Sequence, residues 1–476
     1  MQEEKKRESL AIEDQGPSTT LFKRLDNLKW STWHTRVALI LGTGWALDAF
    51  ETSIVGANIN LISKDLGVTD TSSQALITSM WTAGGIVGAF VFGYIADNYG
   101  RKVTFLASLV LYSLFTVCTS FSQSLIFFLI FRTLTGAGVA AEYSAVTSSV
   151  AEFLPTSYRG KVSALILGAW TVGALLASIV NVLVIPKFSL HMGWRVAFSI
   201  GAISAVFALF ARRKMPESPR WLLTKGRDEE AEQVVSHIEE EAKQPNNREG
   251  IKEGPYEKYS TNDIFSLTFS LLYHYPFRTL FACILDLSQA FGAYGLSSFT
   301  SISLLKLANF PQDQYAFMLF LGALSTIPGT LLTALLYEKV GRKVLLPVNF
   351  ALAGISVLVI YPCAVSQNIT YFYLGNMFYQ FSYTMAWNTS YPMYSEIFPT
   401  KYRTTGIGFA VAVGRIGGFC APLVLNWIYF DTGNGENAIA ALLLCAFFFF
   451  SVCIASIPWA IYGIEGRGKS LEECIE

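Results

Sequence analysis

The sequence predicts an all-α membrane protein with twelve transmembrane helices in two pseudo-symmetric six-helix halves. Hydrophobic residues make up 52% of the 476 residues and charged residues only 15%, whereas a soluble globular chain carries about a quarter charged residues. Twelve apolar runs are long enough to cross a bilayer, and two charged motifs recur at almost the same offset in the two halves. Lipid is therefore the expected solvent, and a duplicated unit is the expected plan.

The expected helices are runs of about 20 mostly apolar residues, the length that crosses a hydrocarbon core of ~30 Å. They span residues 37–62, 76–96, 104–122, 125–153, 161–186, 194–212, 277–304, 314–337, 344–364, 369–395, 405–430 and 438–462. The seventh run contains Asp286 and Gln289. Residues 1–20 are polar and charged, so no cleavable signal peptide is expected and the first helix is expected to remain.

The orientation is predicted from lysine and arginine in the short loops, because these residues resist translocation. The loops after helices 2, 4, 8 and 10 hold Arg101, Lys102, Arg159, Lys161, Lys339, Arg342, Lys343, Lys401 and Arg403. The loops on the opposite side hold Lys64, Lys187 and Lys306. Both termini are therefore expected in the cytoplasm, in a multi-pass protein of the cell (plasma or inner) membrane.

The expected organisation is a cytoplasmic N-terminal tail with an interfacial helix (1–36), an N-terminal six-helix half (37–212), a cytoplasmic central loop (213–276), a C-terminal six-helix half (277–462) and a short cytoplasmic tail (463–476). In the first tail, Leu21, Phe22, Leu25 and Leu28 share one helical face beside basic residues. This pattern is typical of a membrane-interface anchor, and an ordinary cytoplasmic lead-in is the alternative. The stretch 228–243 is expected to form a charged, soluble helix.

Two motifs repeat between the halves. Gly93-Tyr94-Ile95-Ala96-Asp97-Asn98-Tyr99-Gly100-Arg101-Lys102 follows helix 2, and Ala334-Leu335-Leu336-Tyr337-Glu338-Lys339-Val340-Gly341-Arg342-Lys343 follows helix 8. Acid, glycine, arginine and lysine recur in the same register, 241 residues apart. Glu152, Pro155 and Arg159 follow helix 4 with the spacing that Glu396, Pro399 and Arg403 have after helix 10, at an offset of 244. Two motifs at nearly one offset indicate duplication of a six-helix unit.

Each repeated motif places a carboxylate at the cytoplasmic end of a helix and an arginine within reach of neighbouring elements. Such an arginine can pair with a carboxylate in a bidentate manner or lie at another helix terminus. These pairs could latch the halves together on the inside when the outside is open. The alternative is that the charges only end helices and fix the topology. The candidate gate residues are Gly93, Asp97, Gly100, Arg101, Glu152, Arg159, Glu338, Arg342, Glu396 and Arg403.

These motifs resemble the major facilitator superfamily, on its sugar-porter and metabolite:proton-symporter side, over essentially the whole chain after residue 20. The matching segments also include Arg132-Xaa-Xaa-Xaa-Gly136-Xaa-Gly138 and Pro216-Glu217-Ser218-Pro219-Arg220-Trp221 and, more loosely, the tail from Glu465 to Glu473. The resemblance implies the major facilitator fold and secondary active transport by alternating access. It also places Glu217 and Arg220 among the cytoplasmic gate residues.

The substrate class implied by the resemblance depends on the departures from sugar porters. Where those proteins carry a paired glutamine, glycine and asparagine in helix 7, this chain has Ser288, Gln289, Gly292 and Tyr294. Where they carry a tryptophan before the helix-10 glutamate, it has Tyr391. Asp48-Ala49-Phe50-Glu51 and Glu142-Tyr143 resemble instead transporters of niacin-like, aromatic-acid and other organic-acid metabolites. A small organic acid or related polar metabolite is therefore expected, with a hexose or polyol as the alternative.

Charges inside the predicted helices are functional candidates, because each costs about 2.5–3.5 kcal/mol even on the lenient insertion scale. Asp48 and Glu51 share one helical face, and Glu51 and Arg132 both fall about 20 Å from the inner ends of their helices. We expect Glu51, with Asp48 as substitute, to pair with Arg132 when deprotonated and to release it when protonated. The acid aligned with Glu51 has this coupling role in sugar-porter-like symporters. The alternative is a static ion pair.

Substrate-binding candidates are the remaining polar groups of the helices. Arg415 lies near mid-depth among glycines, which suits a guanidinium that receives a carboxylate, and a bridge to the acid after helix 2 or to Asp286 is the alternative. The other candidates are Glu142, Asp286, Gln289, Gln380, Trp387 and Asn388. For each of these, helix–helix hydrogen bonding is the alternative.

Several function classes are disfavoured by composition. The 35 basic residues balance 35 acidic ones, so nucleic acid is not an expected partner. The seven cysteines lack metal-site spacing, and no nucleotide loop or catalytic triad signature is found, so we expect no enzyme, no metal and no cofactor, with the proton gradient as energy source. The expected partners are a small-molecule substrate and the lipid bilayer, and the expected state is a monomer. An exporter or facilitator of the same fold, or a non-transporting nutrient sensor, are the competing functions.

Overall fold

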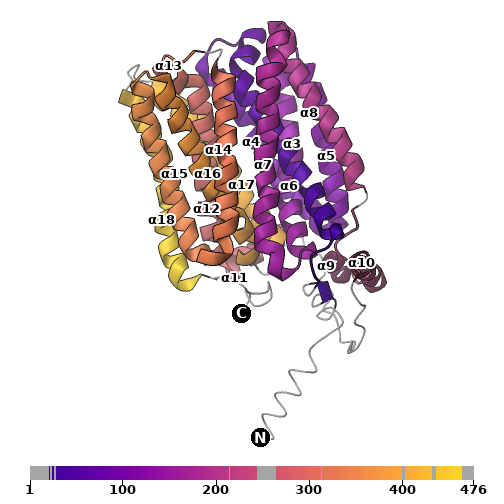
Figure 1. Cartoon of the computed structure of the whole chain (residues 1–476). Helices are drawn as coiled ribbons and strands as arrows, with labels where there is room; N and C mark the ends of the chain where they lie inside the picture. Colours follow the sequence, from indigo (N-terminus) through magenta and orange to yellow (C-terminus); the bar gives the residue numbers. More distant parts are fainter. Residues whose placement is uncertain are drawn as a thin grey trace, which may run out of the picture.

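The computed structural model of the chain is an elongated bundle of helices (Figure 1). It describes residues 21, 24–25, 28–213, 215–243, 264–311, 314–398, 402–430 and 436–463, and no β-strand occurs among them. One end of the bundle carries three short helices, α9 (Pro219–Thr224), α10 (Asp228–Glu241) and α11 (Ile264–His274). This end is called the α10 face below.

Twelve long helices form the body of the molecule. Those of the first half are α3 (Thr32–Asp65), α4 (Thr71–Tyr99), α5 (Arg101–Ser120), α6 (Leu125–Phe153), α7 (Thr156–Leu183) and α8 (Leu190–Arg212). Those of the second half are α12 (Pro276–Phe299), α14 (Tyr315–Val340), α15 (Arg342–Val365), α16 (Ile369–Ile397), α17 (Arg403–Phe430) and α18 (Glu436–Tyr462). A 3-10 turn (Ile185–Lys187) follows α7, and a π-helix (Thr300–Leu304) and α13 (Leu305–Leu307) continue α12.

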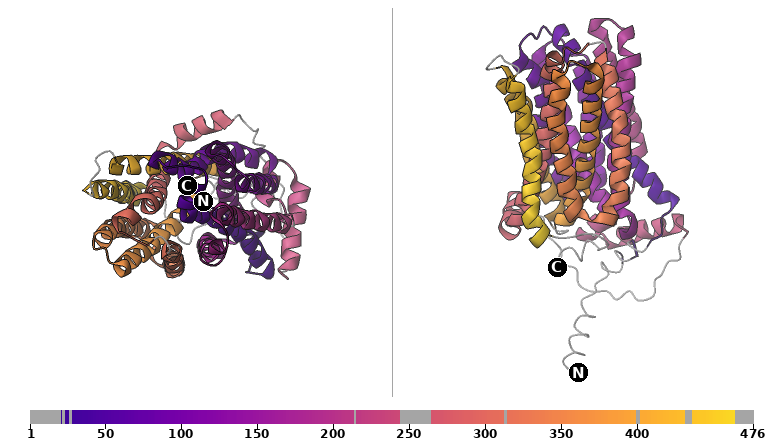
Figure 2. Two further views of the ribbon diagram at one scale, coloured as in Figure 1. Left: turned by 90° about the horizontal axis from the view of Figure 1, so that it is seen from above. Right: turned by 60° about the vertical axis from the view of Figure 1, so that its left-hand side comes forward.

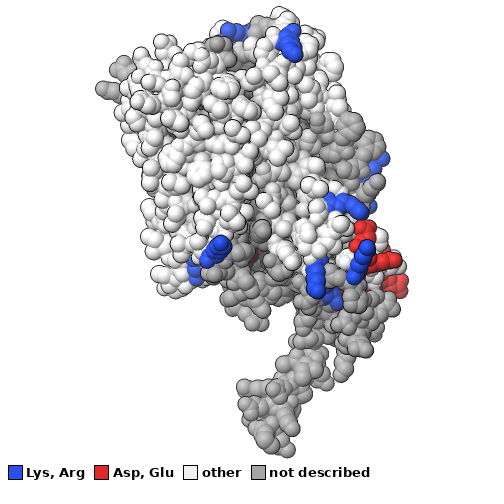
Figure 3. Space-filling model, in the orientation of Figure 1, with Lys and Arg blue, Asp and Glu red and all other residues white. Residues whose placement is uncertain are grey.

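Each predicted run coincides with one of these helices, and the differences lie at the ends. The first helix starts at Thr32, five residues before the expected 37, because Ser31 and His34 close its first turn (Ser31 Oγ to His34 Nδ1, 2.8 Å). Within the described ranges, nine helices are long and apolar enough to cross a membrane, and α6 adds a shorter apolar stretch, Leu125–Ala140. In Figure 3 the middle of the visible face is largely uncharged, and charged side chains gather toward its two ends. This is the surface that a lipid environment requires.

The two halves stand side by side as separate bundles (Figures 1 and 2). They meet mainly where α4 packs against α17 and where α7 packs against α14. Inside the first bundle, α4 and α6 approach at backbone distance: a Cβ on Gly84 would lie 1.7 Å from the carbonyl oxygen of Thr133, and one on Gly136 would lie 1.9 Å from that of Trp81. Small residues at such crossings allow close helix packing without a hydrophobic driving force.

The charged helix expected at 228–243 is present as α10, and it binds the N-terminal segment. Arg24 donates to both carboxylate oxygens of Glu239 (2.8 and 2.7 Å) and of Glu232 (2.8 and 2.9 Å). Hydrogen bonds to these carboxylates, that to Glu239 first, raise the pKa of Arg24 above its usual range. The charge of Arg24 is therefore neutralised by α10.

The described leucines of this segment lie inside the protein, and the interfacial anchor stays a prediction. Leu21, Leu25 and Leu28 are all buried, in the same apolar cluster as Val235 and Ile238 of α10. Phe22 lies outside the described residues. An apolar helical face beside basic residues suits a protein groove as well as a membrane interface, and here acidic α10 supplies the opposite charge for Arg24.

Arg24→Gln is expected to loosen this contact by about 2–3 kcal/mol, because Glu239 is left as an unpaired charge that is 5% exposed. The estimate is below the full cost of a buried pair because Glu232 is 37% exposed and partly screened. Tryptic cleavage at Lys225 and Arg227, beside α10, should then accelerate by roughly 30- to 150-fold.

Arg36→Gln is the matched control. Arg36 pairs with Glu241 at 3.3 Å, but its side chain is 61% exposed, so its loss should change cleavage by less than about fivefold. Equal cleavage rates in the two variants would mean that the N-terminal segment does not hold α10.

Candidate functional site

A buried ion pair joins α3 to α6 in the first half. Arg132 donates to Glu51, and the two side chains are 2% and 1% exposed. Glu51 also accepts a hydrogen bond from the Thr116 hydroxyl of α5 at 3.3 Å, and the ring of Phe198 in α8 lies 5.7 Å from the guanidinium carbon. The contact expected from helix depth is thus present. Asp48 is buried one turn earlier, and Glu51 is the acid that meets Arg132.

Two neighbouring cavities lie along the seam between the halves. The smaller, about 40 Å³, borders Arg132 and is otherwise lined by Thr52, Val55, Gly56, Thr78, Trp81, Tyr294, Ser297, Ser298, Ser301 and Pro422. The larger, about 130 Å³, draws on α3, α7, α12, α14 and α16. The two share four lining residues, Thr52, Gly56, Tyr294 and Ser297. The ion pair therefore borders the space in which a solute would sit.

The larger cavity has aromatic walls with hydroxyl and amide groups between them. Its rings are Trp170, Tyr294, Tyr315, Tyr379 and Tyr383, and its polar groups include Thr52, Ser53, Ser178, Thr326, Gln380 and Thr384. A third cavity of about 20 Å³, toward the α10 face, is lined by Trp387 and Asn388 among others. Of the predicted substrate-binding residues, Gln380, Trp387 and Asn388 thus line cavities, although Asn388 also donates to Thr330 of α14 at 3.1 Å.

Contacts across the seam bracket the cavities at both ends. Toward the α10 face, the rings of Trp45 in α3 and Tyr391 in α16 meet edge to face with centroids 5.7 Å apart. Toward the opposite face, the Tyr315 hydroxyl donates to the Gly56 carbonyl at 3.3 Å, and the hydroxyls of Thr78 and Ser298 lie 3.1 Å apart.

Asp286 and Gln289 belong to a hydrogen-bonded network between α12 and α16. Asp286 Oδ1 accepts from Gln289 Nε2 at 2.7 Å and from the Tyr394 hydroxyl at 3.0 Å, and Ser390 donates to Gln289 Oε1 at 2.6 Å. Neither residue lines the cavities described above. The contacts of Asp286 and Gln289 are therefore those of helix–helix hydrogen bonding, which is the alternative to a role in substrate binding.

Arg415 lies at the seam, one side chain away from the cavity. It is 3% exposed and donates to the Tyr294 hydroxyl at 2.6 Å. Its guanidinium carbon lies 5.0 Å from the ring centroid of Trp81 in α4 and 5.5 Å from that of Tyr294 in α12. Tyr294 lines both main cavities and separates Arg415 from them. If the Tyr294 side chain moved aside, Arg415 would face the cavities.

The repeated motifs at the α10 face adopt matching structures. Gly100 (φ 101°, ψ 162°) and Gly341 (φ 90°, ψ 156°) both end one helix and begin the next in a conformation that is essentially restricted to glycine. Arg101 pairs with Glu152 at 3.0 Å, and Arg342 pairs with Glu396 at 2.8 Å. Each of these two pairs joins helices of one half, α5 to α6 and α15 to α16, so they brace the halves internally. A latch between the halves stays a prediction.

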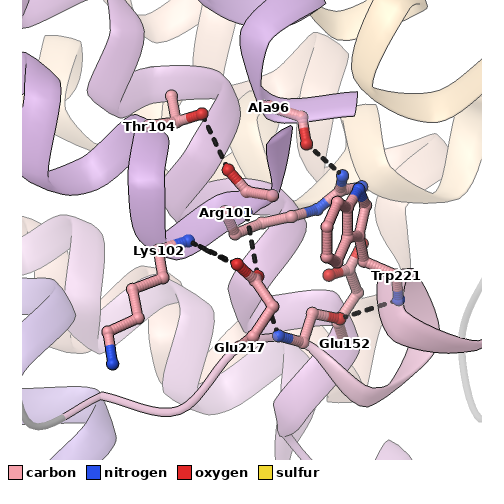
Figure 4. Close-up of polar contacts among 9 residues, drawn as sticks. Ala96, Arg101, Lys102, Thr104, Glu152, Glu217 and Trp221 are labelled. Carbon is pink, nitrogen blue, oxygen red and sulfur yellow. Dashed lines mark hydrogen bonds and ion pairs between the residues drawn. The ribbon is translucent and has the colours of Figure 1, made fainter. Parts of the chain in front are cut away.

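Glu217, from the segment before α9, caps the N-terminus of α5 (Figure 4). Its carboxylate accepts from the backbone N–H groups of Arg101 (2.9 Å), Lys102 (3.2 Å) and Ser218 (2.9 Å). Gly100 at the cap position has no side chain to do this, and a carboxylate at a helix N-terminus also complements the helix dipole. Partial burial raises the pKa of Glu217, against the lowering effect of these hydrogen bonds. Arg220 is buried in α9.

Some predicted residues lie outside the described side chains: Asp97, Glu142, Arg159, Glu338 and Arg403. At Gly93, a Cβ would meet open space, so packing does not require glycine there.

Sequence analysis missed several residues that border the site. They are Trp81, Thr116, Trp170, Tyr379 and Tyr383, together with the capping role of Glu217. Trp81 and Trp170 lie in apolar runs, and in such runs a tryptophan that lines a cavity cannot be told from one that faces lipid. The only available signal was that a solute site combines polar groups with aromatic walls.

Two helical bundles with a lipid-facing surface and a polar, aromatic-walled cavity on the seam between them define a membrane transporter. The family model for sugar (and other) transporters matches residues 30–465. The chain therefore belongs to this family of the major facilitator superfamily.

Relatives and solved structures agree with this assignment. The niacin transporter NiaP of Acinetobacter baylyi is 28% identical over 467 residues, which cover 95% of this chain and 99% of that protein. The organic cation/carnitine transporter 7 of Arabidopsis thaliana is 26% identical, with 96% of each chain covered. The proton:xylose symporter XylE bound to 6-bromo-6-deoxy-D-glucose superposes with a TM-score of 0.72 at 19% identity, over 93% of this chain and 98% of that one. The fold is thus that of the major facilitator transporters.

Gly100→Ala is expected to destabilise the protein more than Gly67→Ala. Both glycines have positive φ (101° and 69°), but a Cβ on Gly100 would lie 2.2 Å from Glu217 Oε2, whereas a Cβ on Gly67 meets nothing within 4 Å. Gly67→Ala should cost about 1–2 kcal/mol of backbone strain. Gly100→Ala should cost about 1–3 kcal/mol of strain, because its backbone conformation is essentially restricted to glycine, and about 1–2 kcal/mol more for the displaced cap. The fall in apparent melting temperature in detergent measures the difference, and equal falls would contradict the capping role.

Proposed function

We propose that this protein takes up a small organic acid by proton-coupled symport and alternating access, driven by the proton gradient without another cofactor. The observation that carries the proposal is the buried Glu51–Arg132 pair at the edge of the solute cavity. The protein would work as a monomer in the plasma or inner membrane.

The proton step follows from charge balance. With Glu51 ionised, its charge and that of Arg132 cancel inside a low-dielectric bundle. Protonation makes Glu51 neutral and leaves the guanidinium with an uncompensated charge, which favours a conformation in which Arg132 faces the cavity or an anionic solute. The proton leaves again when the pair re-forms. Thr116, which donates to the same carboxylate, supports the ionised form.

The solute class is supported by the cavity walls and by relatives. Aromatic rings and a few hydroxyl and amide groups suit a small, flat, polar molecule, and Arg415 lies directly behind Tyr294. NiaP, to which the chain is similar, is named as a niacin transporter, and nicotinate is a flat aromatic carboxylate. An arginine suits a carboxylate because its planar fork can make two parallel hydrogen bonds.

The α10 face is proposed to be cytoplasmic, with both termini on that side. The nine lysines and arginines of the loops after helices 2, 4, 8 and 10 support this orientation against three on the other side. The cavity would then open outward when the Tyr315–Gly56 and Thr78–Ser298 contacts part, and inward when Trp45 and Tyr391 separate.

Glu51→Gln should abolish accumulation of nicotinate against its gradient. The neutral amide mimics the protonated acid, so the proton can no longer alternate with Arg132. Radiolabelled nicotinate uptake into proteoliposomes with an imposed pH gradient should fall by at least tenfold, while exchange of nicotinate between the two sides persists because it needs no proton turnover.

Asp48→Asn is the matched control, one turn away on the same helix and equally buried. It should keep most of the pH-driven accumulation. If both variants still concentrate nicotinate, the coupling proposal is wrong. If wild type exchanges nicotinate but never concentrates it, the protein is a facilitator.

Arg415→Lys should weaken nicotinate binding by roughly 10- to 100-fold, because an ammonium cannot reproduce the bidentate fork and a charge-assisted hydrogen bond contributes about 1.5–3 kcal/mol. Binding of nicotinamide, which has the same ring without the carboxylate, should change little. Thermal-shift titrations of both ligands on both proteins give the comparison. Unchanged nicotinate affinity would argue against carboxylate recognition by Arg415.

A further inference from the structure

The Arg415 side chain crosses the seam between the halves. It belongs to α17 of the second half, yet its guanidinium lies over the ring of Trp81 in α4 of the first half, 5.0 Å from the centroid. Gly85 of α4 makes room for its stem, since a Cβ there would lie 3.2 Å from Arg415 Cδ. These contacts fall on the α4–α17 surface, one of the two main packing surfaces between the halves.

The contact lies near the middle of the membrane. Arg415 is twelve residues past Arg403, the start of α17, which places it about 18 Å from that end. Trp81 is ten residues past Thr71, the start of α4 at the other face, which places it about 15 Å from there. Because Arg415 is only 3% exposed, solvent competes little for its guanidinium, which strengthens the cation–π contact.

We propose that Arg415 on Trp81 is a solute-sensitive latch between the two halves. Without solute, the guanidinium lies over the Trp81 ring, donates to the Tyr294 hydroxyl and is attracted by the buried Asp286 carboxylate, and it ties α17 to α4. A carboxylate in the cavity draws Arg415 past Tyr294 into a bidentate pair, and the contact with Trp81 is given up. The inference rests on the proposed function for its ligand class, and it assigns Trp81 as a positioning residue that acts through Arg415.

The physical basis is a competition for one cation. A charge-assisted pair with a carboxylate is stronger than a bond to a neutral hydroxyl together with an aromatic face. Tyr294 takes part in both positions of Arg415, on Trp81 and at a solute carboxylate, because it accepts a hydrogen bond from Arg415 and lines the cavity. A solute in the cavity thereby removes the contact of Arg415 with Trp81 between the halves. Losing this contact allows the halves to start rocking.

The competition predicts an unusual response to Trp81→Leu. Because the ligand-free protein no longer has a cation–π contact to give up, nicotinate should bind more tightly, by about 2- to 30-fold, the range that corresponds to the strength of such contacts. A purely structural tryptophan would give weaker binding. Equilibrium binding of radiolabelled nicotinate to purified protein measures the change.

Hydrogen exchange measured by mass spectrometry tests the latch itself. Peptides from α4 and α17 should exchange faster in ligand-free Trp81→Leu than in ligand-free wild type. Saturating nicotinate should raise exchange of these peptides in wild type and leave it unchanged in Trp81→Leu. Trp81→Phe, which keeps an aromatic face, should fall between the two.

Trp459→Leu is the control for lost tryptophan packing. Trp459 is as buried as Trp81, but it stacks on Phe281 inside the second half, 4.2 Å between ring centroids. It should leave nicotinate affinity and α4 exchange unchanged.

The outcomes separate the latch from the proposed function. If wild type binds no nicotinate, the proposed solute class is wrong. The contact between Arg415 and Trp81 is then tested by hydrogen exchange of the ligand-free proteins alone. Equal ligand-free exchange of α4 and α17 in wild type and Trp81→Leu would overturn the latch. Where wild type does bind nicotinate, unchanged or weaker binding to Trp81→Leu would overturn it as well.

Discussion

A charge inside the hydrocarbon core needs an opposite charge, a set of hydrogen bonds or an aromatic face, and the site of this protein is organised by that constraint. Glu51 and Arg132 neutralise each other, and Thr116 supports the carboxylate. Asp286 has Gln289 and Tyr394 as donors. Arg415 has the Tyr294 hydroxyl, the Trp81 ring and the opposite charge of Asp286. Since one unmatched charge costs several kcal/mol at this depth, each partner also fixes the packing of its helix.

The parts of the structure that depend on local pattern could be predicted from the sequence. Apolar run length predicted where the long helices lie, because hydrocarbon thickness sets a minimum length. The repeat offset predicted that the two glycine motifs would match, and Gly100 and Gly341 have nearly the same backbone angles. Helix rise alone placed Glu51 and Arg132 at one height, and they meet.

The parts that depend on which surfaces meet could not be predicted. Glu217 caps a helix that begins 116 residues earlier, and Arg24 finds its carboxylates more than 200 residues away. The N-terminal leucines fit a membrane interface and a protein groove equally well. Nothing in the pattern around Arg415 indicates that its ring partner belongs to the other half, because spacing fixes the face of a helix but not the neighbour that covers it.

The two charged centres differ in how they are built into the fold, and this difference matters for alternating access. The Glu51–Arg132 pair joins helices of one half and borders the cavity at the seam, so rigid-body rocking of the halves keeps its two partners together and a change of protonation separates them. Arg415 touches both halves, so rocking alters its surroundings whatever the pH. In the proposed cycle, a proton therefore acts within one bundle and a solute acts at the seam. The cavities that share Thr52, Gly56, Tyr294 and Ser297 provide the space through which each event can influence the other.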